Sequence, residues 1–241
     1  MILALETATA VCGVALVENG KAILEHSFEA MHMHAEKLAL MINDLLSEQN
    51  LKPADLAGIA VSIGPGSFTG LRIGLSTAKG LAFACTLPLV TVPTLKALAL
   101  NALLSSPAQG KIFLLPLLDA KRDEVYGALY LPEGNTLSEI VAPCAFSLKD
   151  AGKVFSDHTP VVLLGDGVEK FVHYHGIGEN SPDQRFIVLD PEHGKCSAAS
   201  VGILGERMLT EGMIADLASA EPLYVKEFST TLNPHKQKDI I

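Results

Sequence analysis

Gly64-Pro-Gly-Ser-Phe-Thr-Gly-Leu-Arg-Ile-Gly74 joins a short apolar run to a stretch with helical spacing. Residues 58–63 before it are rich in β-formers and predict a buried strand, which the proline and second glycine end. Ser67 or Thr69 can cap the helix that follows. The free N–H groups and positive dipole end of that helix favour an anion or an acidic partner group. This junction therefore predicts a strand, a tight turn and a helix that begins beside a potential binding site.

The composition excludes several classes of protein. Of the 241 residues, 49% are hydrophobic and 19% are charged, which excludes a disordered chain and predicts a sizeable core. The formal net charge of −9 weighs against independent, tight binding to RNA or DNA, because that affinity comes largely from Lys and Arg. Aromatic residues make up 5% and Trp is absent, which argues against a stacking platform for single strands. A role with nucleic acid would therefore run through a partner.

Cysteine usage and hydropathy indicate the compartment. The four cysteines lie far apart without a C-x-x-C pair, which predicts reduced core thiols rather than a zinc knuckle or a redox site. Glu6 interrupts the apolar N-terminus and no basic region precedes it, so a signal peptide is not expected. The apolar stretch 81–100 contains two prolines and a lysine, which is atypical of a membrane span. We expect a cytoplasmic protein without a membrane partner.

The hydrophobic pattern predicts a two-lobed α/β duplication. Strands are expected at 2–6, 11–17, 22–28, 58–63, 112–118, 124–131, 136–142, 161–164 and 186–189, and helices at 34–49, 68–84, 94–104, 148–155, from 168, and at 197–211. Asn19-Gly20 predicts a two-residue hairpin turn. Each half is thus predicted to form a β-meander followed by alternating helix and strand, with a mixed sheet in each lobe. The polar segment 105–110 predicts a boundary between an N-terminal lobe (1–104) and a C-terminal lobe (105–241) with a returning C-terminal helix and tail.

Two predicted helices have unusual faces. In 34–49, one apolar stripe and an adjoining one make a wide face that can cover a sheet and also meet a partner. The first stripe is Leu38, Ile42 and Leu45, and the second is Ala35, Ala39 and Leu46. In 68–84, a row of small residues allows close approach to another element, which we interpret as subunit packing. That row is Gly70, Gly74, Ala78 and Ala82, beside a polar row of Thr69, Arg72, Ser76 and Lys79.

The remaining polar motifs leave alternatives open. Leu5-Glu-Thr-Ala-Thr9, at the turn between the first two strands, places a carboxylate and two hydroxyls where a phosphate or Mg²⁺ could sit, or forms a plain polar turn. His32 and His34 are two residues apart and do not share a helix face, so no metal site is expected. The charge cluster in 119–124 indicates a solvated loop or the polar rim of a site. The loop 165–167 indicates a turn or a ligand contact.

Four segments in this order, at 2–9, 64–74, 119–126 and 222–226, resemble the bacterial TsaB family, also called YeaZ, of the actin-like ATPase superfamily. The resemblance implies a two-lobed actin-like (ASKHA) fold and a non-catalytic paralogue of the transferase subunit TsaD. It implies a scaffold or activator that, with TsaD and the ATPase TsaE, supports threonylcarbamoylation of adenosine 37 (t6A37) in tRNAs that read codons beginning with A. The resemblance also implies a homodimer alone, a similar heterodimer with TsaD, tRNA contact only through the complex, and ATP or ADP at the complex interface.

The resemblance also assigns residues. Because family members pair through helices of the N-terminal lobe, the expected partner interface comprises His34, Leu38, Met41, Leu45, Thr69, Arg72, Ser76 and Lys79. A nucleotide site would comprise Glu6, Thr7, Thr9, Gly64, Gly66 and Ser67. The family usually has Asp where this chain has Glu6, and the longer side chain shifts any metal or phosphate contact. No catalytic residue and no metal ligand is expected. The alternatives are a metal-dependent glycoprotease-like peptidase and a stand-alone actin-like ATPase.

Overall fold

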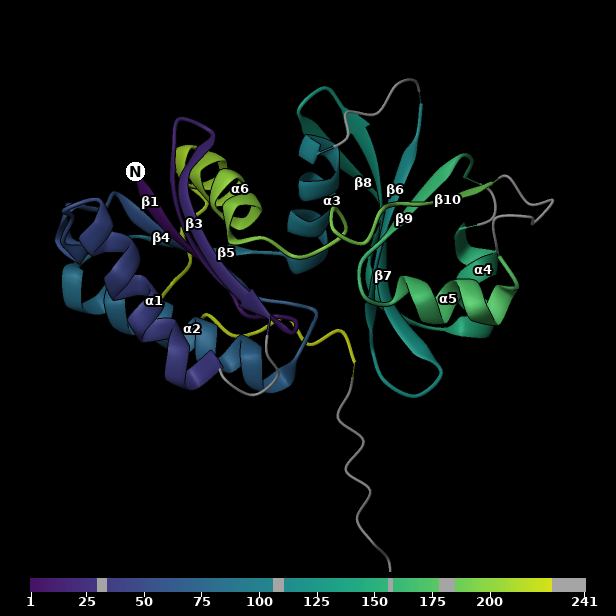
Figure 1. Cartoon of the computed structure of the whole chain (residues 1–241), viewed down its shortest axis with the longest axis horizontal. Helices are drawn as coiled ribbons and strands as arrows, with labels where there is room; N and C mark the ends of the chain where they lie inside the picture. Colours follow the sequence, from purple (N-terminus) through teal and green to yellow (C-terminus); the bar gives the residue numbers. More distant parts are fainter. Residues whose placement is uncertain (30–33, 106–110, 156–157, 178–184, 227–241) are drawn as a thin grey trace, which may run out of the picture.

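Two five-stranded mixed sheets lie side by side, one in each lobe, in the computed structural model of the chain (Figure 1). The structure describes residues 1–29, 34–105, 111–155, 158–177 and 185–226. The first sheet contains β1 (Ile2–Glu6), β2 (Val11–Glu18), β3 (Lys21–Glu29), β4 (Gly58–Ser62) and β5 (Leu89–Val92). The second contains β6 (Phe113–Asp119), β7 (Glu124–Glu133), β8 (Thr136–Ser147), β9 (Val161–Leu164) and β10 (Phe186–Val188).

The two sheets share one topology. The first has the order β3-β2-β1-β4-β5, and the second, read in the matching direction, has β8-β7-β6-β9-β10. In each, an antiparallel meander is extended by two parallel strands, because β1 pairs in parallel with β4 and β6 with β9. This match confirms the predicted α/β duplication. The sequence analysis missed β5 and ended β8 five residues early, at 142.

The helices form layers on both sheets (Figure 1). α1 (His34–Glu48) and α2 (Phe68–Cys85) cover one face of the first sheet, and α6 (Ala198–Thr210) covers the other. α4 (Leu148–Phe155) and α5 (Val168–His175) pack on the outer face of the second sheet, while α3 (Thr94–Ser105) packs on the face toward the other lobe. A short 3-10 turn spans Pro53–Asp55. The predicted boundary at 105–110 falls almost entirely outside the described residues.

α3 and α6 join the lobes through one apolar core. α3 contacts β6 and β7 of the second sheet, α6 contacts β1, β2 and β4 of the first, and the two helices also contact each other. Their buried side chains belong to one cluster that runs from Val17 in the first sheet through Leu98 and Val201 to Tyr130 in the second. The lobes therefore meet through packed helices. No helix in the described parts of the chain is long and apolar enough to cross a membrane.

The small-residue row of α2 packs inside the chain. A Cβ built on Gly70 would lie 2.0 Å from the Thr7 carbonyl oxygen, and one on Gly74 would lie 2.2 Å from the Thr7 Oγ1. Ala78 and Ala82 are fully buried in the core between α1, α2 and the first sheet. The row thus lets α2 approach the end of β1, and the interpretation as subunit packing is wrong because this face is already filled by the chain itself.

Candidate functional site

A cleft of about 800 Å³ lies between the two lobes. The segments that follow β1, β4 and β6 line it, so both sheets direct strand ends toward the same space. One wall consists of residues 8–10, 34–35 and 65–71 with Ile73, and the other consists of residues 118–122 with Tyr126 and Asp166. Residues 223–226 of the C-terminal segment complete the lining. Clefts between lobes are common places for ligands, which makes this space the first candidate site.

The Gly64–Gly74 segment forms the turn and capped helix that its sequence predicts. Ser67 is the N-cap of α2, and its Oγ accepts a hydrogen bond from Gly70 N at 3.3 Å. Ser67 N donates to Ala8 O at 2.7 Å, which ties this turn to the β1–β2 turn. A Cβ on Gly66 would lie 2.3 Å from Ala8 O, so only glycine permits this approach. The start of α2 therefore lies firmly on one wall of the cleft.

The carboxylate predicted to face a phosphate is buried in the protein. Glu6 and Thr7 are both 0% exposed, and neither lines the cleft. Glu6 Oε1 accepts a hydrogen bond from Ala8 N at 2.6 Å, while Oε2 has no partner among the described residues. Burial is the largest influence on this carboxyl and raises its pKa from 4.5 to about 7. Of the six residues expected at a nucleotide site, Thr9, Gly66 and Ser67 line the cleft, whereas Glu6, Thr7 and Gly64 do not.

The opposite wall is a turn stabilised by charges. Burial raises the pKa of Asp119, but hydrogen bonds from Lys170 and Lys121 outweigh it and hold that pKa below its usual value. Lys121 and Arg122 have positive φ angles of 64° and 52°. Lys170 Nζ donates to Arg122 O at 2.7 Å and so supports this turn. The charge cluster thus forms the polar rim of the cleft, with the exposed Arg122 side chain in the lining.

Asp166 completes that rim. Its Oδ1 accepts a hydrogen bond from Asp119 N at 2.9 Å, and burial raises its pKa. Gly167 N donates to Leu117 O at 3.0 Å, which places the 165–167 loop against the end of β6. The loop therefore forms a turn whose Asp166 lines the cleft, and its contact with a ligand stays a prediction.

The residues predicted for a partner interface separate into two groups. Thr69, Arg72 and Ser76 are exposed on α2, and Met41 and Lys79 are partly buried. His34, Leu38 and Leu45 are only 6%, 1% and 0% exposed, so they are corrected to interior positions. Leu38 and Leu45 pack in the core beneath α1 and α2. His34 Nε2 lies 3.0 Å from Thr9 O, within hydrogen-bond distance, on the cleft wall.

Two exposed apolar residues of this helical layer were missed. Leu40 of α1 is 57% exposed and Phe83 of α2 is 82% exposed. Phe83 follows Lys79 by four residues and Ser76 by seven, so it continues the row that the sequence analysis treated as polar. Extending that row to the end of α2 would have found it. The outer layer of α1 and α2 thus carries both polar and large apolar side chains.

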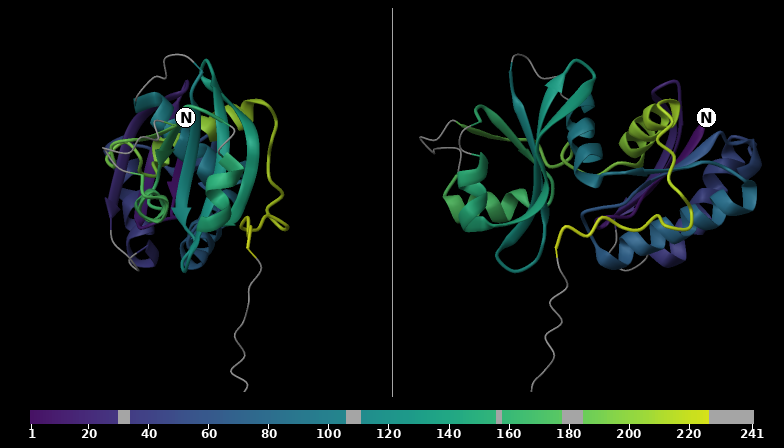
Figure 2. Two further views of the ribbon diagram at one scale, coloured as in Figure 1. Left: turned by 90° about the vertical axis from the view of Figure 1, so that its right-hand side faces the viewer. Right: turned by 180° about the vertical axis from the view of Figure 1, so that it is seen from behind.

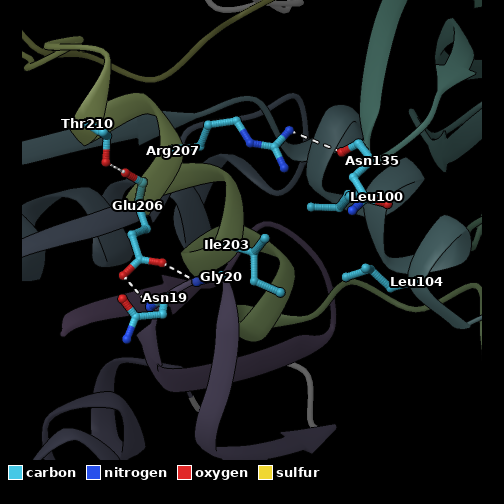
Figure 3. Close-up of a pocket in the computed structure, with 9 residues that line it drawn as sticks. All are labelled: Asn19, Gly20, Leu100, Leu104, Asn135, Ile203, Glu206, Arg207 and Thr210. Carbon is cyan, nitrogen blue, oxygen red and sulfur yellow. Dashed lines mark hydrogen bonds between the residues drawn. The ribbon is translucent and has the colours of Figure 1, made fainter.

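A second hollow, of about 500 Å³, lies between the lobes beside α3 and α6 (Figure 3). Glu206 Oε1 accepts from Asn19 N at 2.9 Å and Oε2 from Gly20 N at 2.5 Å, which pins the β2–β3 turn. Arg207 Nη1 donates to Asn135 O at 3.1 Å and connects α6 to the turn between β7 and β8. This hollow is therefore bordered by a polar contact between the lobes.

Potential metal ligands do not gather among the described residues, where no group of three or more His, Cys, Asp or Glu side chains could hold an ion. His32, which the sequence analysis considered with His34, lies outside the described residues. The described cysteines are free thiols, and Cys12 and Cys196 are buried.

A duplicated meander with parallel extensions, two helices packed together between the sheets and a cleft between the lobes define an actin-like fold. The family model TsaD, tRNA N6-adenosine threonylcarbamoyltransferase, matches residues 28–168. The chain therefore belongs to this family. It is 29% identical to the TsaB protein of Bacillus subtilis over 93% of this chain and 98% of the relative. It is 37% identical to that of Escherichia coli over 56% of each chain.

Solved structures agree with this assignment. A structure titled YeaZ, from Pseudomonas aeruginosa, superposes with a TM-score of 0.77 at 28% identity and covers 92% of this chain and 98% of that one. A second Pseudomonas aeruginosa structure, titled as similar to peptidase YeaZ, has a TM-score of 0.76 at 28% identity and covers 93% and 99%. Both alignments extend over nearly the whole chain, including both lobes, which confirms the resemblance to TsaB.

Proposed function

We propose that this chain takes part in the biosynthesis of threonylcarbamoyladenosine in tRNA, as a non-catalytic subunit that binds and activates a TsaD transferase together with TsaE. Two findings support this role. The relatives from Bacillus subtilis and Escherichia coli are named tRNA threonylcarbamoyladenosine biosynthesis protein TsaB, and the first is matched along nearly its full length. The net charge of −9 favours tRNA contact through a partner over independent binding.

The exposed face of α1 and α2 is the observation that carries the scaffold role. Phe83 is 82% exposed and Leu40 is 57% exposed, and both lie on one layer of two adjacent helices. Large apolar side chains at this exposure favour burial against another protein. Thr69, Arg72 and Ser76 of α2 are also exposed and supply polar groups for such a contact. We therefore assign TsaD, or a second copy of the chain, to this face.

The position of Glu6 supports the non-catalytic part of the proposal. A carboxylate that bound a metal or positioned a phosphate would have to reach the cleft, but Glu6 is 0% exposed. Its pKa, raised to about 7, also leaves this carboxyl less ionised at neutral pH than an ordinary glutamate, and the anion is the form that binds a cation. A stand-alone ATPase predicts ATP turnover by the purified chain. ATP or ADP at the interface with TsaD stays a prediction.

The experiment is a binding assay with purified TsaD and surface variants of this chain. Phe83→Glu and Ser76→Glu place charges on the proposed interface and should weaken the complex at least tenfold, without lowering thermal stability. Tyr174→Glu is the matched control, because Tyr174 is 52% exposed on α5, far from this layer (Figure 1). Unchanged affinity of both interface variants would contradict the assignment of this face.

A further inference from the structure

We propose that residues 222–226 form a strap that holds the two lobes together across the mouth of the cleft, so that loosening either end opens it. Figure 2 shows this segment, in yellow, leaving the first lobe and reaching the second. Residues 223–226 also contribute to the cleft lining. The inference concerns the motion of this chain alone and is independent of the proposed function.

The first lobe holds one end of the strap. Leu223 N donates to Ile63 O, just beyond β4, at 2.7 Å. Tyr224 Oη accepts a hydrogen bond from Arg72 Nε of α2 at 3.0 Å, and its ring centroid lies 5.4 Å from that of Phe68. The Arg72 guanidinium lies 3.7 Å from the Phe68 ring centroid, so backbone, aromatic and cationic contacts all fix this end.

Gly64 makes that approach possible. A Cβ at Gly64 would lie 2.8 Å from Leu223 O, and its φ of +117° already favours glycine. Gly64 N donates to Thr94 Oγ1 at 2.9 Å and Gly64 O accepts from Thr94 N at 2.9 Å, so the turn is fixed to the start of α3. The strap thus contacts a turn that two hydrogen bonds fix to the first residue of α3.

The second lobe holds the other end through Lys226. Its Nζ donates to a Glu124 carboxylate oxygen and, at 3.5 Å, to Ala120 O. The Lys226 and Glu124 side chains are 32% and 34% exposed, so water only partly screens their attraction. Ala120 lies on the turn between β6 and β7, which forms the opposite wall of the cleft, and Glu124 is the first residue of β7.

The segment between the two anchors is too short to let the cleft walls move apart. Leu223 and Lys226 are three positions apart, and such a segment reaches about 10 Å even when extended. Because both ends are bonded, the walls cannot separate without breaking one anchor. The apolar core shared by α3 and α6 joins the lobes elsewhere and would act as the hinge, in the manner of hinge closure in other two-lobed proteins.

Hydrogen exchange measured by mass spectrometry tests the strap with Lys226→Met and, from the other lobe, Glu124→Gln. Both variants should speed exchange about two- to fivefold in residues 65–73 of the first lobe, the effect expected from losing one partly exposed ion pair. The hydrogen bonds of Lys226 with Glu124 and with Ala120 involve no residue of 65–73, so this change would report transmission across the cleft. High salt should also speed exchange in residues 65–73 of the wild-type protein, because it screens the same ion pair.

Lys149→Met is the matched control, since Lys149 is exposed on α4 away from the strap. It should leave exchange in 65–73 unchanged. Thermal stability should stay unchanged in all three variants. Faster exchange confined to residues 118–126, or no change anywhere, would overturn the proposal. The two variants remove the same ion pair from opposite sides. An effect that both share therefore comes from loss of the ion pair, and an effect of only one comes from that side chain alone.

Discussion

Glu6→Gln tests the account of the buried carboxyl at the end of β1. In the folded chain burial raises the Glu6 pKa to about 7, from an ordinary value of 4.5. The folded state therefore holds this proton more tightly than the unfolded state, so its stabilising contribution is complete below pH 4.5 and is lost as the pH rises through 7. At pH 8 the difference amounts to about 3 kcal/mol of unfolding free energy. A neutral amide does not titrate and escapes this loss.

The assay is urea denaturation of wild type and Glu6→Gln at pH 5 and pH 8. Altered hydrogen bonding also changes the stability of the variant at both pH values, so the informative quantity is the change in the difference from wild type between pH 5 and pH 8. We expect the variant to gain about 2.5 kcal/mol relative to wild type between the two pH values, divided almost evenly above and below pH 6. Glu36→Gln, at an exposed site on α1, is the control. Parallel stability curves for wild type and Glu6→Gln would refute the reasoning.

Three further predictions concern α1 and α2, each measured by the free energy of unfolding in urea. Gly70→Ala should cost at least about 2 kcal/mol, because its Cβ would meet the Thr7 carbonyl oxygen at 2.0 Å, whereas Gly80→Ala, in open space on the same helix, should stabilise by about 0.5–1 kcal/mol. Equal effects would contradict the packing account. Ser67→Ala should cost about 1 kcal/mol through loss of the N-cap bond, and no loss would exclude that capping role. Leu45→Ala should cost about 2–5 kcal/mol, and an unchanged free energy of unfolding would contradict the placement of Leu45 in the core.

Much of the fold was predictable because local patterns and tertiary structure agree. Asn19-Gly20 forms the expected turn with both residues at positive φ, and Ser67 caps α2 as its position predicts. β5 was missed because its four residues follow a proline and lie inside a long apolar stretch, where a short buried strand and a helix look alike. Periodicity therefore located the long elements and failed at one short strand that lies inside an apolar stretch.

The candidate site was harder to predict because periodicity does not say what covers a face. Gly70 and Gly74 signalled close packing, but only the fold places Thr7 against them. Leu45 belongs to an apolar stripe that one sheet already buries completely. Glu6 looked like a ligand for phosphate because it ends a strand, yet its side chain remains inside the core. Each correction depends on contacts between segments far apart in the sequence.

Reconstitution of tRNA modification tests the central claim most directly. TsaD, TsaE, the enzyme that makes the threonylcarbamoyl donor, ATP, threonine, bicarbonate and tRNA are combined with and without this chain, and threonylcarbamoyladenosine is measured by mass spectrometry. The account predicts that the modified nucleoside forms with wild type and Tyr174→Glu, and falls to near background when the chain is omitted or carries Phe83→Glu. Undiminished modification in the mixture that lacks this chain would contradict the claim.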